Sequence, residues 1–207
     1  AIFDVDKIDR MDMDAEKDGI MTSVYLEEVA KDYEGTGRNR KGDEVAHRYG
    51  CSGIDGTTFG PIPGSPKGSK QYLMVCYGIY SDLDRDDNDN QVTLCYDVSH
   101  WAKYERPLSQ FAMHRCGPEK PEHKYFTYTG NTRWGVQNFE YDPYRHVYFM
   151  TVYYGKKERF PNYHLFLVDA SVAPKVGNIP GLEEEGELWT LLDAGLRHKA
   201  TGIRGFD

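Results

Sequence analysis

The sequence predicts an all-β protein of the β-propeller class, of which this chain is a part. Three observations lead to this prediction. Apolar residues gather in short runs rich in Tyr, Val, Phe and Leu, and turn residues flank each run. Two hairpins carry apolar residues on both strand faces. A glycine-containing pattern recurs in tandem along the chain.

Composition excludes several classes of function. The 207 residues include 33 acidic and 25 basic side chains, giving a formal net charge of −8. A general nucleic-acid binder or a binder of anionic membranes would instead need clustered Lys and Arg. Aromatic residues make up 14% of the chain, which argues against disorder. No apolar run approaches the roughly 18 residues of a membrane span.

The first 48 residues are predicted to form part of one blade. Residues 3–6 resemble the outgoing strands of the later hairpins, so we expect a third strand there. Residues 23–31 fit either a short helix or a strand. The chain opens without Met, so either a signal peptide has been removed or the chain begins within a longer protein. The compartment stays open, with a secreted or extracytoplasmic location favoured.

Two hairpins are the clearest strand signals. Because both strands of each are apolar on both faces, we expect each hairpin to be covered on both sides. The first consists of residues 72–80 and 92–98 joined by the polar loop 81–90, and the second of residues 147–154 and 163–169 joined by residues 155–162.

The tandem repeat sets the predicted blades. Related segments begin at Gly53, Gly135 and Gly202, with spacings of 82 and 67 residues. Residues 110–113 and 187–192 are expected as fourth strands. The predicted units are therefore a blade over 49–130, a second over 131–200 and the start of another at 201–207. A flat sandwich is the alternative, although it would not explain the repeat.

Aligning the repeats places three polar residues at one position of the innermost strands. These are Asp55, Gln137 and Arg204. A carboxylate, an amide and a guanidinium facing one central funnel would suit a sugar, since together they accept and donate hydrogen bonds and fix an oxyanion. Trp134 is the best candidate for stacking on a ligand. The alternative is that these positions are polar because water fills the channel.

Other aromatic and histidine residues have simpler interpretations. Tyr77, Tyr80, Tyr148, Tyr153 and Tyr154 are expected to pack within blades rather than to contact sugar. His47 precedes an innermost strand and could lie at the rim of the channel, with an ordinary loop residue as the alternative.

Several of these segments resemble the five-bladed β-propeller glycosidases, which include arabinan-, xylan- and β-fructan-degrading families. The resemblance lies in residues 52–59, 72–78, 97–104 and 140–143. It implies a propeller of five blades when complete and a glycoside hydrolase-like protein acting on a poly- or oligosaccharide in the central funnel. Asp55 would then orient the substrate or tune the catalytic acid. Gly56 stands where those families usually have Pro, and Ser99 follows Asp97 rather than preceding it.

Hydrolysis of a glycoside needs a second carboxyl group, about 5–5.5 Å or roughly 6.5–9.5 Å from the first. Glu140 is the nearest candidate in the sequence. It lies three residues beyond Gln137, and an odd offset along a strand turns a side chain to the opposite face. The partner of Asp55 could therefore lie in a missing part of the protein or in a second chain. The alternative function is a non-catalytic propeller that binds a glycan or a protein.

The loop 82–90 resembles a calcium-binding loop in one respect. Asp82, Asp84 and Asp86 place carboxylates at alternate positions. The sixth and twelfth positions, however, are Asp87 and Thr93 instead of Gly and Glu. A solvated acidic hairpin tip that discourages edge pairing is the simpler interpretation.

The four cysteines lack a C-x-x-C pair, so a structural zinc site is not expected. Cys76 and Cys95 should lie nearly opposite each other across the first hairpin. We expect two packed thiols there rather than a disulfide, because a cross-strand disulfide is geometrically demanding.

Overall fold

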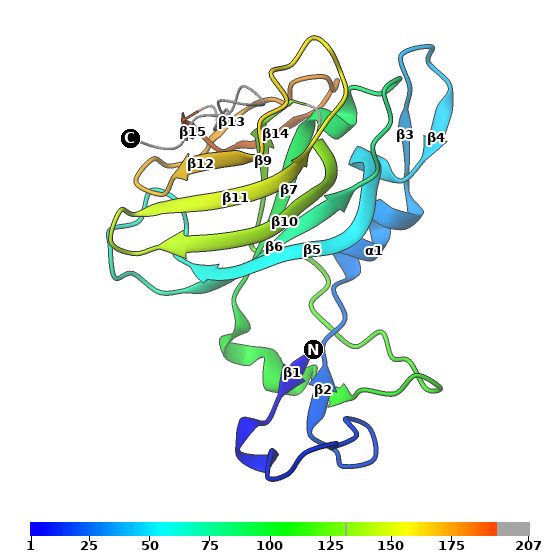
Figure 1. The fold of residues 1–207 in the computed structure, drawn as a ribbon, viewed down its shortest axis with the longest axis vertical. Helices are drawn as coiled ribbons and strands as arrows, with labels where there is room; N and C mark the ends of the chain where they lie inside the picture. Colours follow the sequence, from blue (N-terminus) through cyan, green and yellow to red (C-terminus); the bar gives the residue numbers. More distant parts are fainter. Residues whose placement is uncertain (131, 194–207) are drawn as a thin grey trace.

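Two antiparallel meanders dominate the computed structural model, which describes residues 1–130 and 132–193 (Figure 1). The first meander runs β5-β6-β7-β9 and the second runs β10-β11-β12-β15. Their strands are β5 (Cys51–Gly60), β6 (Tyr72–Ile79), β7 (Asn90–Tyr96), β9 (His123–Tyr128), β10 (Thr132–Asp142), β11 (Val147–Tyr154), β12 (Leu165–Asp169) and β15 (Leu191–Asp193). The chain is thus predominantly β, with several sheets. The described residues form no closed ring of blades.

The repeat predicted from the sequence corresponds to equivalent places in these meanders. β5 and β10 are each the first strand of their meander, and they lie next to each other in the structure. Gly53 and Gly135 occupy matching positions and both have positive φ, 116° and 73°. The third repeat segment, residues 201–207, lies outside the described residues.

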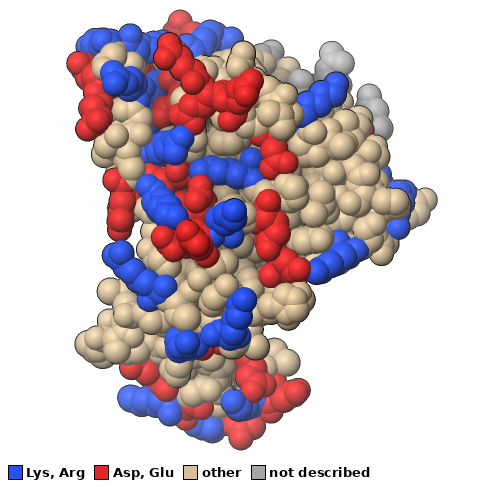
Figure 2. Space-filling view, turned by 180° about the vertical axis from the view of Figure 1, so that it is seen from behind, with Lys and Arg blue, Asp and Glu red and all other residues tan. Residues whose placement is uncertain are grey.

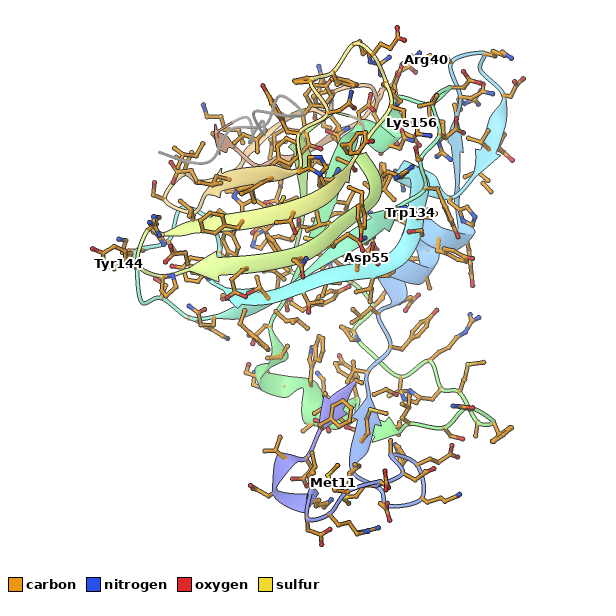
Figure 3. The ribbon with its side chains drawn as sticks, in the orientation of Figure 1. Met11, Arg40, Asp55, Trp134, Tyr144 and Lys156 are labelled. Carbon is orange, nitrogen blue, oxygen red and sulfur yellow. The ribbon has the colours of Figure 1, made fainter. Side chains whose placement is uncertain are left out.

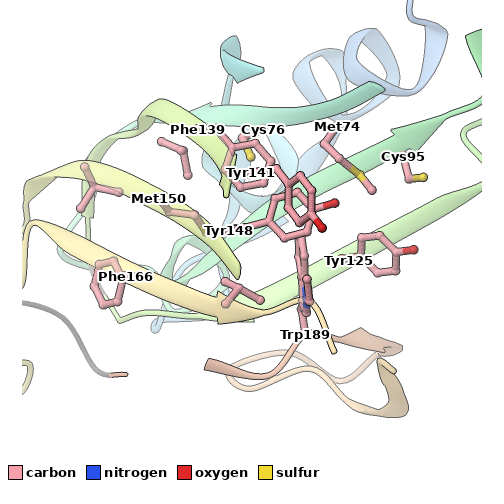
Figure 4. Close-up of a cluster of buried hydrophobic side chains, with 14 residues drawn as sticks. Met74, Cys76, Cys95, Tyr125, Phe139, Tyr141, Tyr148, Met150, Phe166 and Trp189 are labelled. Carbon is pink, nitrogen blue, oxygen red and sulfur yellow. The ribbon is translucent and has the colours of Figure 1, made fainter. Parts of the chain in front are cut away.

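The space between the two sheets holds a large aromatic cluster (Figure 4). Tyr125 of the first sheet and Tyr148 of the second both pack against Trp189. Met74, Cys76, Phe139 and Met150 add to the same cluster. Burial of these side chains, worth roughly 1.5–3 kcal/mol each for large apolar groups, holds the sheets together.

The prediction that the first hairpin is covered on both sides is confirmed. Its second face packs under helix α1 (Glu27–Glu34), which contributes Val29 to a core with Val75, Tyr77 and Leu94. The second hairpin differs. β11 alternates between fully buried residues and residues that are half-buried or exposed, so only its inner face is fully covered by the residues described.

The predicted fourth strands are partly wrong. Residues 110–113 are outside any strand, and β9 pairs with β7 in their place. Polar and apolar residues alternate poorly in β9, which hid it from the sequence pattern. The expected strand at 187–192 is divided between two sheets. β14 (Glu185–Leu188) pairs with β9 in parallel, and β15 pairs with β12 of the other sheet. Trp189, which lies between β14 and β15 in the sequence, is buried where the chain passes from one sheet to the other.

Residues 1–48 differ from the expected partial blade. The strand expected at residues 3–6 is cut short, because β1 covers only Ile2–Phe3 and residues Val5–Lys7 form a 3₁₀ turn instead of continuing it. β1 pairs with β2 (Met21–Ser23), which pairs with β8 (Arg106–Pro107) in a small separate sheet. The segment 23–31 is divided, with a strand ending at Ser23 and a helix beginning at Glu27. A hairpin of β3 (Thr36–Arg38) and β4 (Glu44–Ala46) follows.

The remaining strand, β13 (Lys175–Asn178), forms the far edge of the first sheet beside β14. On the face seen in Figure 2, acidic and basic side chains are interspersed rather than separated into fields of one sign. None of the helices in the described part of the chain has the length and apolar character needed to cross a lipid bilayer.

The cysteine prediction is correct in its outcome but not in its register. Cys51, Cys76, Cys95 and Cys116 are all free thiols. Cys76 lies opposite Thr93, and Cys95 lies opposite Met74, so the two cysteines are not directly across from each other. The pairing is shifted by two residues from the one that would place Cys76 opposite Cys95. This register corresponds to a β6 that continues to Ile79 and a β7 that begins at Asn90.

Candidate functional site

The structure brings Asp55 and Gln137 together, as the repeat alignment predicts. The Gln137 side-chain amide donates a hydrogen bond from Nε2 to Asp55 Oδ2 at 2.6 Å, and a second one to the backbone carbonyl of Trp134 at 2.9 Å. Figure 3 shows Asp55 and Trp134 near each other at one edge of the paired sheets. Arg204, the third residue of the predicted set, lies outside the described residues.

A β-bulge places each member of this pair. The register of β5 shifts between Ile54 and Thr57, and that of β10 shifts between Val136 and Asn138. Asp55 and Gln137 are therefore skipped by the regular strand pairing. Bulges bend a strand and re-aim its side chains, and here they turn two residues from different sheets toward each other. The sequence pattern gave no sign of either bulge.

Glycines provide the space around Asp55. A Cβ atom at Gly78 would come within 2.9 Å of Asp55 Oδ2 and 2.4 Å of Ser52 Oγ. A Cβ atom at Gly135 would come within 2.3 Å of the Tyr77 carbonyl oxygen. The first strand of the second sheet can therefore lie directly against the β6 backbone only because these positions lack side chains.

The electrostatics of Asp55 reflect its position where the two sheets meet. The residue is exposed, but partial burial of the carboxyl raises its pKa above the ordinary value, and the hydrogen bond from Gln137 opposes the shift. Partial shielding of a carboxylate from water disfavours its charged form, whereas an N–H donor favours it.

Trp134 remains half-exposed, with 49% of its surface accessible, as expected for a stacking candidate. Its backbone has a φ of 69°, which is rare for a residue with a side chain. Of the tyrosines expected to pack within blades, Tyr77 and Tyr148 are buried. Tyr80, Tyr153 and Tyr154 are substantially exposed, which corrects that prediction for these three.

Glu140 is directed away from this pair, in agreement with the odd offset from Gln137. A Cβ at Gly56 would lie 3.0 Å from Phe139 Cβ, so Phe139 faces the first sheet together with Gln137. Glu140, next along the strand, is exposed and belongs to the opposite face. It is therefore not placed to act with Asp55.

The three aspartates proposed as calcium ligands have different partners. Asp86 pairs with Arg40 and with Arg159, while Asp82 accepts a hydrogen bond from the Asp84 backbone. Across residues 1–130 and 132–193, no group of three or more His, Cys, Asp or Glu side chains could hold a metal ion. Calcium binding at Asp82, Asp84 and Asp86 stays a prediction.

The loop that carries these aspartates surrounds a buried ammonium group from another loop, which the sequence analysis missed. Lys157, from the loop between β11 and β12, donates to Asn88 Oδ1 at 2.8 Å, to Asp89 Oδ1 at 2.7 Å and to the Arg85 carbonyl. Its side chain is 3% exposed, and that of Asp89 is 2% exposed. We call these four residues the Lys157 lock, since they fasten one hairpin loop to the other.

Comparison of the chain with protein-family models, with curated proteins and with solved structures finds no match.

Proposed function

We propose that this chain is part of a carbohydrate-active β-propeller and that the Asp55–Gln137 pair binds a saccharide. The observation that carries the proposal is the hydrogen-bonding state of the pair. Both amide hydrogens of Gln137 are already donated, to Asp55 and to the Trp134 carbonyl. Asp55 Oδ1 and Gln137 Oε1 have no hydrogen bond among the described residues and remain as acceptors. The pair is therefore complementary to a ligand rich in hydroxyl donors.

Neighbouring aromatic surface supports a sugar rather than another hydroxylated ligand. The exposed Trp134 ring lies one residue from the Gly135 contact that brings the sheets together. An aromatic face attracts the slightly positive C–H groups of a sugar ring, while the acceptors bind its hydroxyl groups. Small-molecule sites commonly combine apolar surface with a few well-placed polar groups in this way.

The arrangement of the two meanders supports the propeller part of this proposal. In a propeller, blades of about four antiparallel strands stand side by side with their first strands innermost. β5 and β10 are adjacent first strands, and the two meanders face each other. Under this proposal, further blades come from the rest of a longer protein or from a second chain.

The position of Glu140 favours a second candidate, non-catalytic binding of a glycan or a protein. Because Glu140 belongs to the other face of β10, glycoside hydrolase activity requires a carboxylate outside the described residues to act with Asp55. Binding alone requires only the acceptor pair and the aromatic surface.

Replacement of Asp55 tests the binding proposal. We expect Asp55→Ala to weaken binding by about tenfold or more, since a hydrogen bond to a charged group contributes about 1.5–3 kcal/mol. Affinities would be measured by titration calorimetry with oligomers of β-1,4-linked xylose, α-1,5-linked arabinose and β-2,1-linked fructose. Release of reducing sugar from the same oligomers separates hydrolysis from binding.

Tyr144→Ala is the matched control, because Tyr144 is highly exposed at the distant β10–β11 turn (Figure 3). It should bind each oligomer as the wild type does. Equal affinities for Asp55→Ala and the wild type would refute the proposed site, and a wild type that binds none of the three oligomers would refute carbohydrate binding.

A further inference from the structure

Three aromatic rings lie in contact just before β5 and were not anticipated as a unit. The half-buried His47 ring lies between the exposed Tyr33 and Tyr80, with ring-centroid distances of 4.5 Å and 5.0 Å and interplanar angles of 35° and 37°. We call these three tilted rings the stack. Tyr33 comes from α1, and Tyr80 directly follows β6. Tyr33 and Tyr80 are 42% and 38% exposed, so part of each side chain is accessible to a ligand.

The backbone holds the stack in place. His47 Nδ1 lies 2.6 Å from the Tyr33 carbonyl oxygen, which ties the imidazole to the end of α1. His47 and Tyr49 have positive φ values of 66° and 57°. Such backbone conformations cost about 1–3 kcal/mol each and persist only where the surroundings enforce them, often at binding sites.

The β6 strand and the residue that follows it connect the stack to the Asp55–Gln137 pair. Tyr80 is two residues from Gly78, the position whose missing side chain makes room for Asp55. The Tyr80 amide donates to the Gly50 carbonyl at 2.8 Å, so the β5–β6 pairing continues to this point. Two residues along a strand span about 7 Å, which is of the order of one sugar unit.

Trp134 lies on another side of the same pair. It precedes Gly135, where an added Cβ would come within 2.8 Å of both Gly78 Cα and the Ile79 amide nitrogen. The β6 segment around Gly78 therefore connects Trp134, the acceptor pair and Tyr80. Aromatic rings flank a central pair of hydrogen-bond acceptors.

We propose that the Tyr33–His47–Tyr80 stack is a second subsite, which binds the sugar ring adjacent to the one held by Asp55 and Gln137. This inference rests on the proposed function and names its ligand more closely, as an oligosaccharide rather than a single sugar. The rings supply apolar faces for C–H contacts, and the tyrosine hydroxyls can bond the sugar hydroxyls at the edge. Affinity should therefore rise with ligand length.

Chain-length dependence tests the subsite. Using the single sugar and the six-unit oligomer of the xylose, arabinose and fructose series, we expect the wild type to prefer the oligomer of the series it binds. Tyr80→Ala should weaken binding of the six-unit oligomer about five- to tenfold and leave the affinity for the single sugar unchanged, because only an oligomer reaches the stack. Tyr80→Phe, which keeps the ring, should retain most of the length preference.

The outcomes separate the subsite from the proposed function. If Tyr80→Ala and Tyr33→Ala both keep the wild-type preference for six units while Asp55→Ala loses binding, the subsite is wrong and the proposed function stands. If the Asp55→Ala protein binds like the wild type, the proposed function is wrong. Absence of binding to every oligomer overturns both. Thermal unfolding of each variant, with Tyr144→Ala as the exposed control, verifies that the protein is folded.

Discussion

Replacing Lys157 by Met is expected to lower the free energy of unfolding by about 2–4 kcal/mol, since buried acceptors on Asn88 and Arg85 lose this donor and Asp89 is left with its ion pair to Arg159. Within residues 1–130 and 132–193 the Lys157 ammonium donates to three acceptors, and both it and Asp89 are almost completely buried. Met fills a similar volume without supplying a donor. Chemical denaturation followed by tryptophan fluorescence measures the change.

Two further variants test whether the loss of stability comes from the buried Lys157 ammonium. Asp89→Asn combined with Lys157→Met should recover part of the loss, because the buried negative charge is then removed as well. Lys67→Met should cost little, since Lys67 is exposed and donates only to the Tyr144 carbonyl. If the single Lys157 variant unfolds at the same denaturant concentration as the Lys67 variant, the lock does not stabilise the fold.

The second large effect is expected at Gly135. Gly135→Ala should lower the free energy of unfolding by about 2–4 kcal/mol, from left-handed backbone strain together with overpacking. The new Cβ would lie 2.3 Å from the Tyr77 carbonyl oxygen. This oxygen belongs to the backbone of a paired strand, so it cannot rotate away from the added atom. Moving β10 away from β6 also separates Gln137 from Asp55, so saccharide binding should fall together with stability.

Gly68→Ala is the matched control for this substitution. Gly68 has a similar positive φ, 81° against 73° at Gly135, but a Cβ there would have no heavy atom within 4 Å. This variant therefore reports the backbone strain alone, and the difference between the two variants measures the contact between sheets. Equal losses of stability, measured by denaturation, would show that close packing at Gly135 contributes nothing.

The sequence predicted the parts of this structure that depend on local pattern. The hairpins containing β6 and β7, and β11 and β12, follow from their dense apolar runs. The alignment of Asp55 with Gln137 followed from repeated glycines, which are needed because both positions have positive φ. A repeated backbone requirement is visible in a sequence even where the side chains differ.

The features that were missed depend on contacts between distant segments. Lys157 looks like one charge in an exposed loop until the loop around Asp89 is placed against it. The Tyr33–His47 contact needs α1 to lie beside the start of β5. The fourth strand of the first meander was missed because β9 has a weak pattern and is stabilised from both sides by its neighbours. Periodicity does not report any of these relationships.

The order of strands in the first sheet has a consequence for synthesis of the chain. β9 is covered on its outer side by β14, which lies beyond the first three strands of the second meander in the sequence. During synthesis, the backbone groups on the outer edge of β9 remain without their β14 partners until about sixty more residues have been made. Exposed strand edges readily pair with other chains. A nascent chain halted between β12 and β14 should therefore depend on chaperones more strongly than the finished protein.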